Sequence, residues 1–230
     1  MQSSFNYRGM QNLGFVFSLL PLARLLAGDK ESLVAFLTRH LQLFNTHPYL
    51  SAPIIGSVAH MEEQEADKAG AAAVNLKNAL MGPYAAIGDS FFWGAMKPLA
   101  AVFGVLLALQ QYLPAPLALL LLYNPVHLWV RVRGFVEGYQ HGKEGIYFIR
   151  YLELPRLTGW VRWFSLAGLG AIAAMISHSN HAPMLGRWVE LLTPVAFLSL
   201  IILCYWGIRN GISQVKIIYG MFVISCVLSF

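Results

Sequence analysis

The sequence predicts an all-α integral membrane protein with several transmembrane helices, and three observations carry this prediction. Hydrophobic residues make up 57% of the 230 residues and charged residues only 12%, whereas soluble globular domains carry about 25% charged residues. Long apolar runs begin at Leu99 and recur to the end of the chain. Where polar and apolar residues mix, the apolar ones recur at helical spacing, as in Leu33, Phe36 and Leu37.

Residues 1–79 are predicted to form cytoplasmic or interfacial helices. The apolar segment 12–27 is shorter than the roughly 20 residues that a span needs, so it is typical of an interfacial helix. The acidic stretch 59–68 contains Glu62 and Glu63, and a charge run of this kind is typical of a solvated helix face.

Composition also limits the class of ligand. The formal net charge is +5, but the basic residues are scattered, and no basic stripe with interleaved aromatic residues predicts binding of nucleic acid. The histidines form no ligand set with nearby acidic or thiol residues. The sequence therefore predicts neither a metal nor a cofactor.

Three polar residues, Asn45, Thr46 and His47, precede Pro48 and allow two interpretations. Asn45 or Thr46 could end one helix and cap the next, with Pro48 in its first turn. Alternatively, the three residues form a polar cluster that faces a translocation site. Both interpretations are open at this point.

The stretch 80–94 is predicted to be a broken or re-entrant helical segment. Gly82 and Pro83 interrupt a helix, because proline lacks an N–H group and restricts the residue before it. Gly88 provides a second break. At membrane depth such a backbone survives only when it is buried in protein or lines a cavity. The alternative is a surface loop between a soluble region and the first span.

Asp89 is the strongest functional candidate in this stretch. An ionisable residue in a membrane segment is costly and is a functional candidate by default. Its other possible role is to cap a helix that starts at Ser90. Ser90 and Trp93 add a hydroxyl group and an aromatic ring, which suit recognition of a sugar.

The remainder of the chain divides into three regions by composition. Residues 80–130 comprise the broken segment and interrupted membrane helices, and residues 164–230 comprise C-terminal transmembrane helices. Between them, residues 131–163 form a basic amphipathic connection whose glycines recur every three or four residues and allow close helix approach. The positive-inside rule places the N-terminal region and the turn at 207–216 on the cytoplasmic side.

Several motifs, in order from residue 5 to about residue 142, resemble the IID membrane subunit of the mannose/fructose/sorbose family of sugar phosphotransferase systems. The matching pieces are Phe5 to Phe15, Arg39 to Leu41, Phe44 to Pro48, Ile55-Gly56, Glu62-Glu63, Leu80 to Pro83, Gly88 to Ser90, Phe92-Trp93, Lys97-Pro98, Asn124 before Arg131, and Gly138-Tyr139 with Gly142.

This resemblance implies a multi-pass protein of the bacterial cytoplasmic membrane that is not itself an enzyme. With a IIC subunit it would form, as a hetero-oligomer in membrane lipid, the path of a sugar of the hexose class. A separate cytoplasmic IIAB protein would phosphorylate the sugar. Glu62 and Glu63 would contact a partner, and the candidates for sugar binding or translocation are Asn45, Thr46, His47, Asp89, Ser90 and Trp93.

Two further functions compete with this expectation. One is a membrane scaffold or regulatory paralogue that assembles with IIC without transporting sugar. The short segment Ser177 to Arg187, and the lack of a glycine-rich run within 143–160, depart from the family pattern and favour it. The other is a stand-alone secondary transporter, which the scarcity of full-length spans and of intramembrane charge pairs disfavours.

Overall fold

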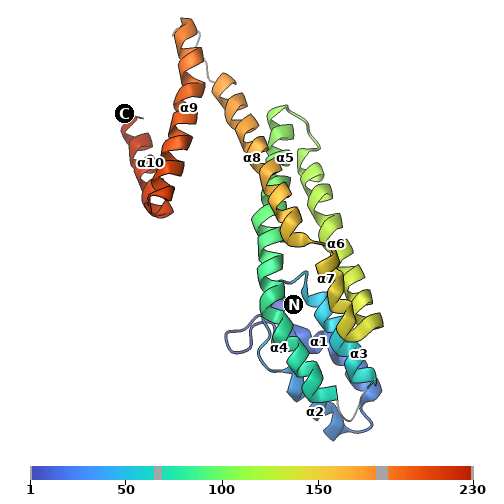
Figure 1. The fold of residues 1–230 in the computed structure, drawn as a ribbon. Coiled ribbons are helices and arrows are strands. Elements are labelled where there is room, and N and C mark those ends of the chain that lie inside the picture. The colour runs from blue at the N-terminus through green and yellow to red at the C-terminus, as the bar shows by residue number, and fades with distance from the viewer. Residues whose placement is uncertain (1, 65–68, 180–185, 229–230) are drawn as a thin grey trace. The chain divides into compact units, whose positions relative to one another are not determined.

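The computed structural model describes residues 2–64, 69–179 and 186–228. These residues are predominantly helical and contain no β-strand apart from isolated bridges (Figure 1). The chain divides into two compact units, Met1–Gly168 and Leu169–Phe230. The all-α class that the sequence predicts is confirmed.

The first unit begins with helices α1 (Asn12–Leu26), α2 (Lys30–His40) and α3 (Ser51–Gln64). A capping box starts α2, in which the Asp29 carboxylate accepts a hydrogen bond of 2.8 Å from the Ser32 N–H. The N–H groups of Asp29 and Ser32 are two of the donors that a helix start otherwise leaves without partners. Helix α1 packs against both α2 and α3.

Helix α4 (Ala69–Gly88), the π-helical stretch η2 (Asp89–Met96) and α5 (Lys97–Leu109) follow one another without a loop (Figure 1). The predicted break at Gly82 and Pro83 is therefore wrong, because Pro83 lies inside α4. Proline removes one N–H donor, and apolar helices tolerate this loss when neighbouring groups adjust. The change from α to π geometry comes directly after Gly88, the second predicted break, and no re-entrant loop forms.

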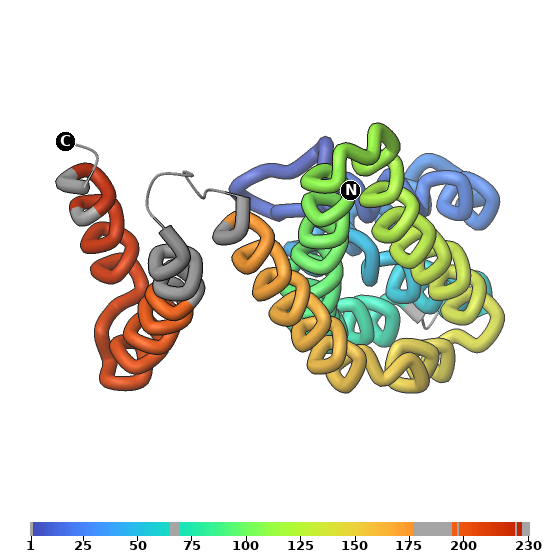
Figure 2. Tube along the Cα trace, turned by 90° about the horizontal axis from the view of Figure 1, so that it is seen from above, coloured from blue at the N-terminus to red at the C-terminus, as the bar shows by residue number. Residues whose placement is uncertain are grey.

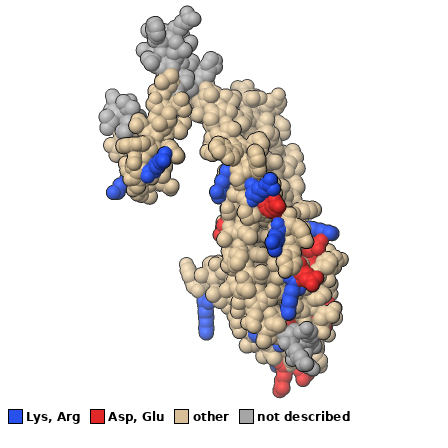
Figure 3. All heavy atoms as spheres, viewed as in Figure 1, with Lys and Arg blue, Asp and Glu red and all other residues tan. Residues whose placement is uncertain are grey.

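The stretch Gly70–Leu109 contains 40 residues and is apolar enough to cross a membrane. At 1.5 Å per residue it is about 60 Å long, roughly twice the thickness of the hydrocarbon core. The stretch is therefore longer than a single span requires, and its α4 part packs against α2 and α3. Residues 98–130 contain no Lys, Arg, Asp or Glu, and the corresponding end of the first unit is free of charge colours in Figure 3.

Helix α6 (Ala115–His141) returns beside α5, as Figure 2 shows, and leads into η3 (Gly142–Ile146), α7 (Tyr147–Tyr151) and α8 (Leu154–Ser179). The stretch Ala115–Ile176 is the second one, among the described residues, that is long and apolar enough to span a membrane. The sequence-based boundaries at 79, 130 and 163 fall inside α4, α6 and α8, so composition changes within helices and not between them.

Glycines allow α3 and α6 to pack closely. A Cβ atom at Gly138 would overlap the Pro53 carbonyl oxygen, and one at Gly56 would overlap the Phe135 carbonyl oxygen. Backbone atoms of the opposing helix occupy the space that a side chain would need. The predicted close approach at this glycine-rich face is thus confirmed.

The second unit contains α9 (Gly186–Arg209) and α10 (Gln214–Leu228), which pack against each other. Gly211 lies in the turn between them with a φ of +83°, a conformation that glycine adopts at little cost. The segments Leu198–Arg209 and Gln214–Val223 are apolar but shorter than a full span. Most of the short segment Ser177 to Arg187, which departs from the family pattern, lies outside the described residues.

Candidate functional site

A group of aromatic and histidine side chains lies where the loop before α3, η2 and α6 meet. All its members belong to the first unit, and adjacent rings lie 4.3–6.3 Å apart between centroids. We call this group the aromatic cluster, and it consists of His47, Tyr49, Phe92, Trp93, Tyr123 and His127.

His47 lies at the centre of the aromatic cluster and is only 1% exposed. Its ring stacks on Phe92 with centroids 5.2 Å apart and an interplanar angle of 14°. The Trp93 ring meets the same ring in an edge-type arrangement, with centroids 4.8 Å apart and an interplanar angle of 61°. Gly88 permits this arrangement, because a Cβ atom there would overlap Cβ and Cγ of His47. The glycine predicted as a helix break therefore makes room for a histidine.

Tyr49 links His47 to α6. Its ring stacks on His127 with centroids 4.3 Å apart, and its hydroxyl oxygen accepts a hydrogen bond of 3.3 Å from the Tyr123 hydroxyl. His127 Nε2 lies 3.2 Å from Oδ1 of Asn124. The aromatic cluster thus joins side chains from three segments that are far apart in the sequence.

Several buried polar atoms near the aromatic cluster lack a hydrogen-bond partner within the described residues. They are Oγ1 of Thr46, Nε2 of His47 and Nδ1 of His127. An unpaired buried polar atom costs about 1–3 kcal/mol, and most such atoms in native proteins are paired with protein or water. These three buried atoms would need a polar ligand or water to complete their hydrogen bonding.

Two cations border the aromatic cluster. Nζ of Lys97 lies 5.7 Å from the centroid of the Trp93 ring, and Cζ of Arg131 lies 6.0 Å from that of Tyr49. Burial, and secondly the charge of Lys97, lower the pKa of His47 to about 4. His47 is consequently neutral at pH 7 and presents one N–H donor and one acceptor nitrogen.

The loop that carries Asn45, Thr46 and His47 is held by Gln11. The Gln11 amide donates a hydrogen bond of 2.8 Å to the Thr46 carbonyl and accepts one of 3.3 Å from the Thr46 N–H. Helix α3 begins only at Ser51. The prediction that Asn45 or Thr46 caps a helix with Pro48 in its first turn is therefore wrong, and Asn45 is exposed.

The structure brings Trp93 to the aromatic cluster but leaves Asp89 and Ser90 outside it. Asp89 is exposed, and Ser90 Oγ accepts a hydrogen bond of 3.4 Å from Arg162 of α8. Since the helix continues through Gly88 into η2, no helix starts at Ser90. The capping role considered for Asp89 is therefore wrong.

Sequence reasoning missed Tyr49, Tyr123 and His127 as members of the site. Tyr123 and His127 are separated by four residues, which places them on one face of a helix, and Arg131 continues this face. That spacing was a usable signal. Tyr49 gives no such signal, because its role depends on the path of the loop.

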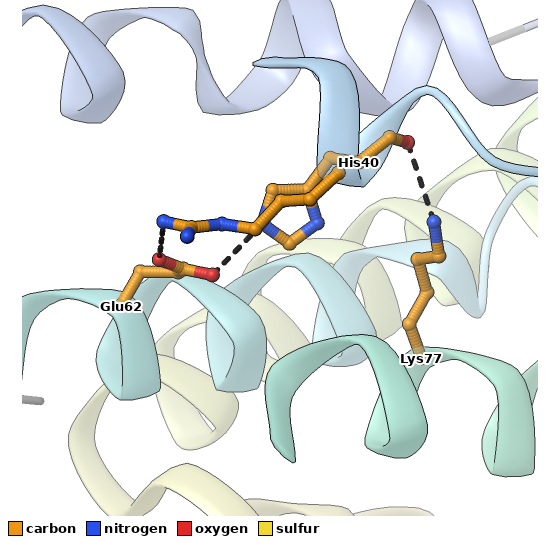
Figure 4. A network of polar contacts seen from close by, with 4 residues as sticks. His40, Glu62 and Lys77 are labelled. Atoms are coloured by element: carbon orange, nitrogen blue, oxygen red, sulfur yellow. Dashed lines mark hydrogen bonds and ion pairs between the residues drawn. The ribbon is translucent and has the colours of Figure 1, made fainter. Parts of the chain in front are cut away.

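A second polar centre, the Glu62 network, joins α2, α3 and α4 (Figure 4). Glu62 is 1% exposed, and its carboxylate accepts a hydrogen bond of 2.7 Å from Arg39 Nη2 and lies 2.9 Å from His40 Nε2. Lys77 donates a hydrogen bond of 3.3 Å to the His40 carbonyl at the end of α2. We define the Glu62 network as Arg39, His40, Glu62 and Lys77.

The Glu62 network corrects the prediction of a solvated acidic face. Glu62 is buried in ion pairs of its own chain, so it offers no carboxylate to a partner. Glu63 is exposed and accepts a hydrogen bond of 2.6 Å from the Tyr139 hydroxyl. Burial lowers the pKa of His40, while its hydrogen bond to Glu62 opposes that shift.

Fold and composition together define an all-α membrane protein whose first unit holds a partly buried cluster of aromatic and histidine side chains. The chain belongs to the mannose/fructose/sorbose family of the phosphotransferase system as an IID component. The family model described as "PTS system mannose/fructose/sorbose family IID component" matches residues 1–230.

Curated relatives agree with this assignment. The mannose-specific EIID component of Escherichia coli (strain K12) is 33% identical, over 97% of this chain and 86% of the relative. The fructose permease IID component of Bacillus subtilis (strain 168) is 32% identical, over 96% of this chain and 87% of the relative.

Solved structures share the fold. A membrane protein structure with 32% identity has a TM-score of 0.77, over 98% of this chain and 90% of that chain. The mannose transporter ManYZ, solved by cryo-electron microscopy in complex with microcin E492, contains a chain with 32% identity and a TM-score of 0.57, at the same coverage.

Proposed function

We propose that this chain forms, together with a IIC subunit, the path by which a hexose crosses the bacterial cytoplasmic membrane. The hexose is then phosphorylated by a separate IIAB protein, and this chain contributes no phosphoryl donor. The observation that carries the proposal is the aromatic cluster with its unpaired buried polar atoms. The mannose and fructose relatives support the substrate class.

The chemistry of the aromatic cluster suits a neutral sugar. Sugars bind to aromatic ring faces and to fixed hydrogen-bonding groups in sites that exclude bulk water. Trp93 is 41% exposed and offers a ring face, while the neutral His47 and Thr46 lie buried beside it with unpaired polar atoms. In our proposal the hexose stacks on Trp93 and its hydroxyl groups reach these atoms.

The exposed polar residues have a different role in this proposal. Asn45 lies two residues before His47 and Asp89 three residues before Phe92, but their side chains are exposed. They, with the half-buried Ser90, contact sugar on its way to the aromatic cluster. Glu63 contacts a partner subunit, because its carboxylate is exposed at the surface of α3.

Assembly follows from the surface of the chain. Large apolar side chains such as Phe103, Leu120 and Leu121 are exposed on α5 and α6, and contiguous apolar surface marks contact with lipid or with other chains. The relative in ManYZ is part of a mannose transporter complex. We therefore propose a multi-pass hetero-oligomer with IIC, surrounded by lipid, with the basic segments on the cytoplasmic side.

A Trp93→Ala variant tests the sugar site. Loss of one stacking face reduces uptake of labelled hexose by roughly tenfold when the complete system is expressed. Trp129→Ala is the matched control, because Trp129 is also exposed but lies outside the aromatic cluster. Co-purification with IIC verifies assembly of both variants. Equal uptake by wild type and Trp93→Ala would favour a scaffold that carries no sugar.

A further inference from the structure

A cavity lies between α4 and the segment from η3 to the start of α8, and its lining residues do not include members of the aromatic cluster. Its volume is about 510 Å³. Tyr84 and Ile149 line it and are 4% and 3% exposed. The Tyr84 hydroxyl donates a hydrogen bond of 3.0 Å to the Ile146 carbonyl, so its polar atom is satisfied and its ring contributes apolar lining. We call this space the α4–α7 cavity.

One wall of the α4–α7 cavity belongs to a stretch that is apolar enough to cross a membrane, since Tyr84 and Ile87 lie in Gly70–Leu109. The opposite wall adds the buried Ile149 and also carries charged side chains. The apolar part of this lining matches the environment of an acyl chain.

The exposed lining of the α4–α7 cavity is basic. Arg150 and Arg156 are exposed, as is Glu153 between them. Arg156 pairs with Glu153 at 3.2 Å, an exposed contact that is worth little. Arg150 forms no ion pair among the described residues. The lining therefore carries one cation that is free to meet an external anion.

The charge of the surrounding segment has the same sign. Residues 131–163 contain six Lys and Arg residues against three Glu residues, and a basic excess marks the cytoplasmic side of a membrane protein. The cytoplasmic leaflet carries anionic lipids, and basic pockets between helices on that side bind lipid headgroups.

We infer that the α4–α7 cavity binds an anionic phospholipid. One acyl chain lies against Tyr84, Ile87 and Ile149, and the phosphate headgroup lies at Arg150 and Arg156. An apolar floor below a basic rim fits a lipid with an anionic headgroup better than a zwitterionic one. This site is separate from the sugar site, so the inference is independent of the proposed substrate.

The test uses the full chain in nanodiscs of phosphatidylethanolamine with or without phosphatidylglycerol. Native mass spectrometry counts the phospholipids that stay bound after the nanodisc is removed. The wild type should retain phosphatidylglycerol in preference to phosphatidylethanolamine. Arg150→Gln should reduce that preference roughly fivefold, which is the effect of one cation near an anionic surface.

Arg24→Gln is the matched control, because Arg24 is exposed on α1, outside the lining of the α4–α7 cavity. It should retain phosphatidylglycerol as the wild type does. An Ile87→Trp variant fills the cavity without changing a charge and should also lose bound lipid. Thermal unfolding verifies that each variant is folded.

Three results would overturn the inference. The first is equal retention of the two lipids by the wild type, and the second is unchanged retention in both Arg150→Gln and Ile87→Trp. The third is displacement of the lipid when the IIC subunit is added, which would assign the cavity to a protein interface.

Discussion

Replacement of Gly88 by alanine should disrupt the aromatic cluster, although alanine is the better helix former. A Cβ atom at position 88 would overlap Cβ and Cγ of His47, and Nδ1 would lie 2.8 Å away. These atoms are at the root of a buried ring and cannot turn aside. Either the loop that carries His47 or the start of η2 must move, and the stacking of His47 on Phe92 is then lost.

The net effect follows from three terms. Alanine gains up to about 1 kcal/mol over glycine in a helix interior. Overpacking in a filled site costs about 1–3 kcal/mol, and loss of an aromatic pair costs about 0.5–1.5 kcal/mol more. The expected destabilisation is about 2 kcal/mol, which lowers the apparent Tm by roughly 4–8 °C for a chain of this size.

Gly82→Ala is the matched control for Gly88→Ala. Both glycines lie in α4, but nothing lies within 4 Å of the place where a Cβ atom at Gly82 would be. Gly82→Ala should therefore raise the apparent Tm and leave hexose uptake unchanged. It also tests whether Gly82 interrupts the helix, because a required break would make alanine harmful.

The assay combines thermal unfolding in detergent with uptake of labelled hexose for both variants. Gly88→Ala should lose stability and hexose uptake, while Gly82→Ala should lose neither. If Gly88→Ala matched Gly82→Ala in both measurements, the close approach of His47 to Gly88 would be refuted.

Three further predictions concern charged and titrating groups. Glu62→Gln should destabilise the chain by about 2–3 kcal/mol, because Arg39 and His40 lose a buried anion. The control Glu63→Gln, at an exposed position, should change stability by at most about 0.5 kcal/mol. Equal effects of the two variants on the apparent Tm would contradict the Glu62 network. Stability should fall as the pH is lowered from about 6.5 to about 4, since the unfolded chain binds a proton at His47 in this window and the folded chain does not. His47→Gln should make this dependence shallower in thermal unfolding, and an unchanged slope would refute a neutral His47. Asp89→Ala should reduce hexose uptake without altering the apparent Tm, because the Asp89 side chain is exposed; unchanged uptake would remove Asp89 from the proposed path.

Much of the fold could be predicted from composition and local pattern. The low charge content indicated a helical membrane protein, and the glycines around Gly138 indicated close packing before their partners in α3 were known. Both signals are local and physical. Glycines on one helix face leave no side chains there, so the backbone of another helix can approach and fill that space.

The errors arose where tertiary contacts decide the outcome. Pro83 is a helix breaker by local chemistry, but α4 continues through it. Glu62 belongs to a charge run, yet it is buried, where its carboxylate pairs with Arg39 and His40 of another helix. Spacing along the chain contains no information about such partners.

For the same reason, the sequence indicated only some members of the aromatic cluster. His47 and Trp93 were chosen because a histidine and an indole suit a sugar, and the structure places them in contact. Tyr49 was missed because only the folded loop brings it between His47 and His127. Asp89 was a candidate because of its charge alone, and in the structure its side chain is exposed, three residues before Phe92 of the aromatic cluster.

The most direct test of the central claim is accumulation of labelled hexose phosphate in cells that lack their own hexose uptake. Three strains are compared, which express IIC and IIAB with this chain, without it, or with its Trp93→Ala variant. Phosphorylated hexose should accumulate with the wild-type chain, should be absent without the chain, and should be strongly reduced with Trp93→Ala. Accumulation that is the same with and without the chain would contradict its role in sugar transport.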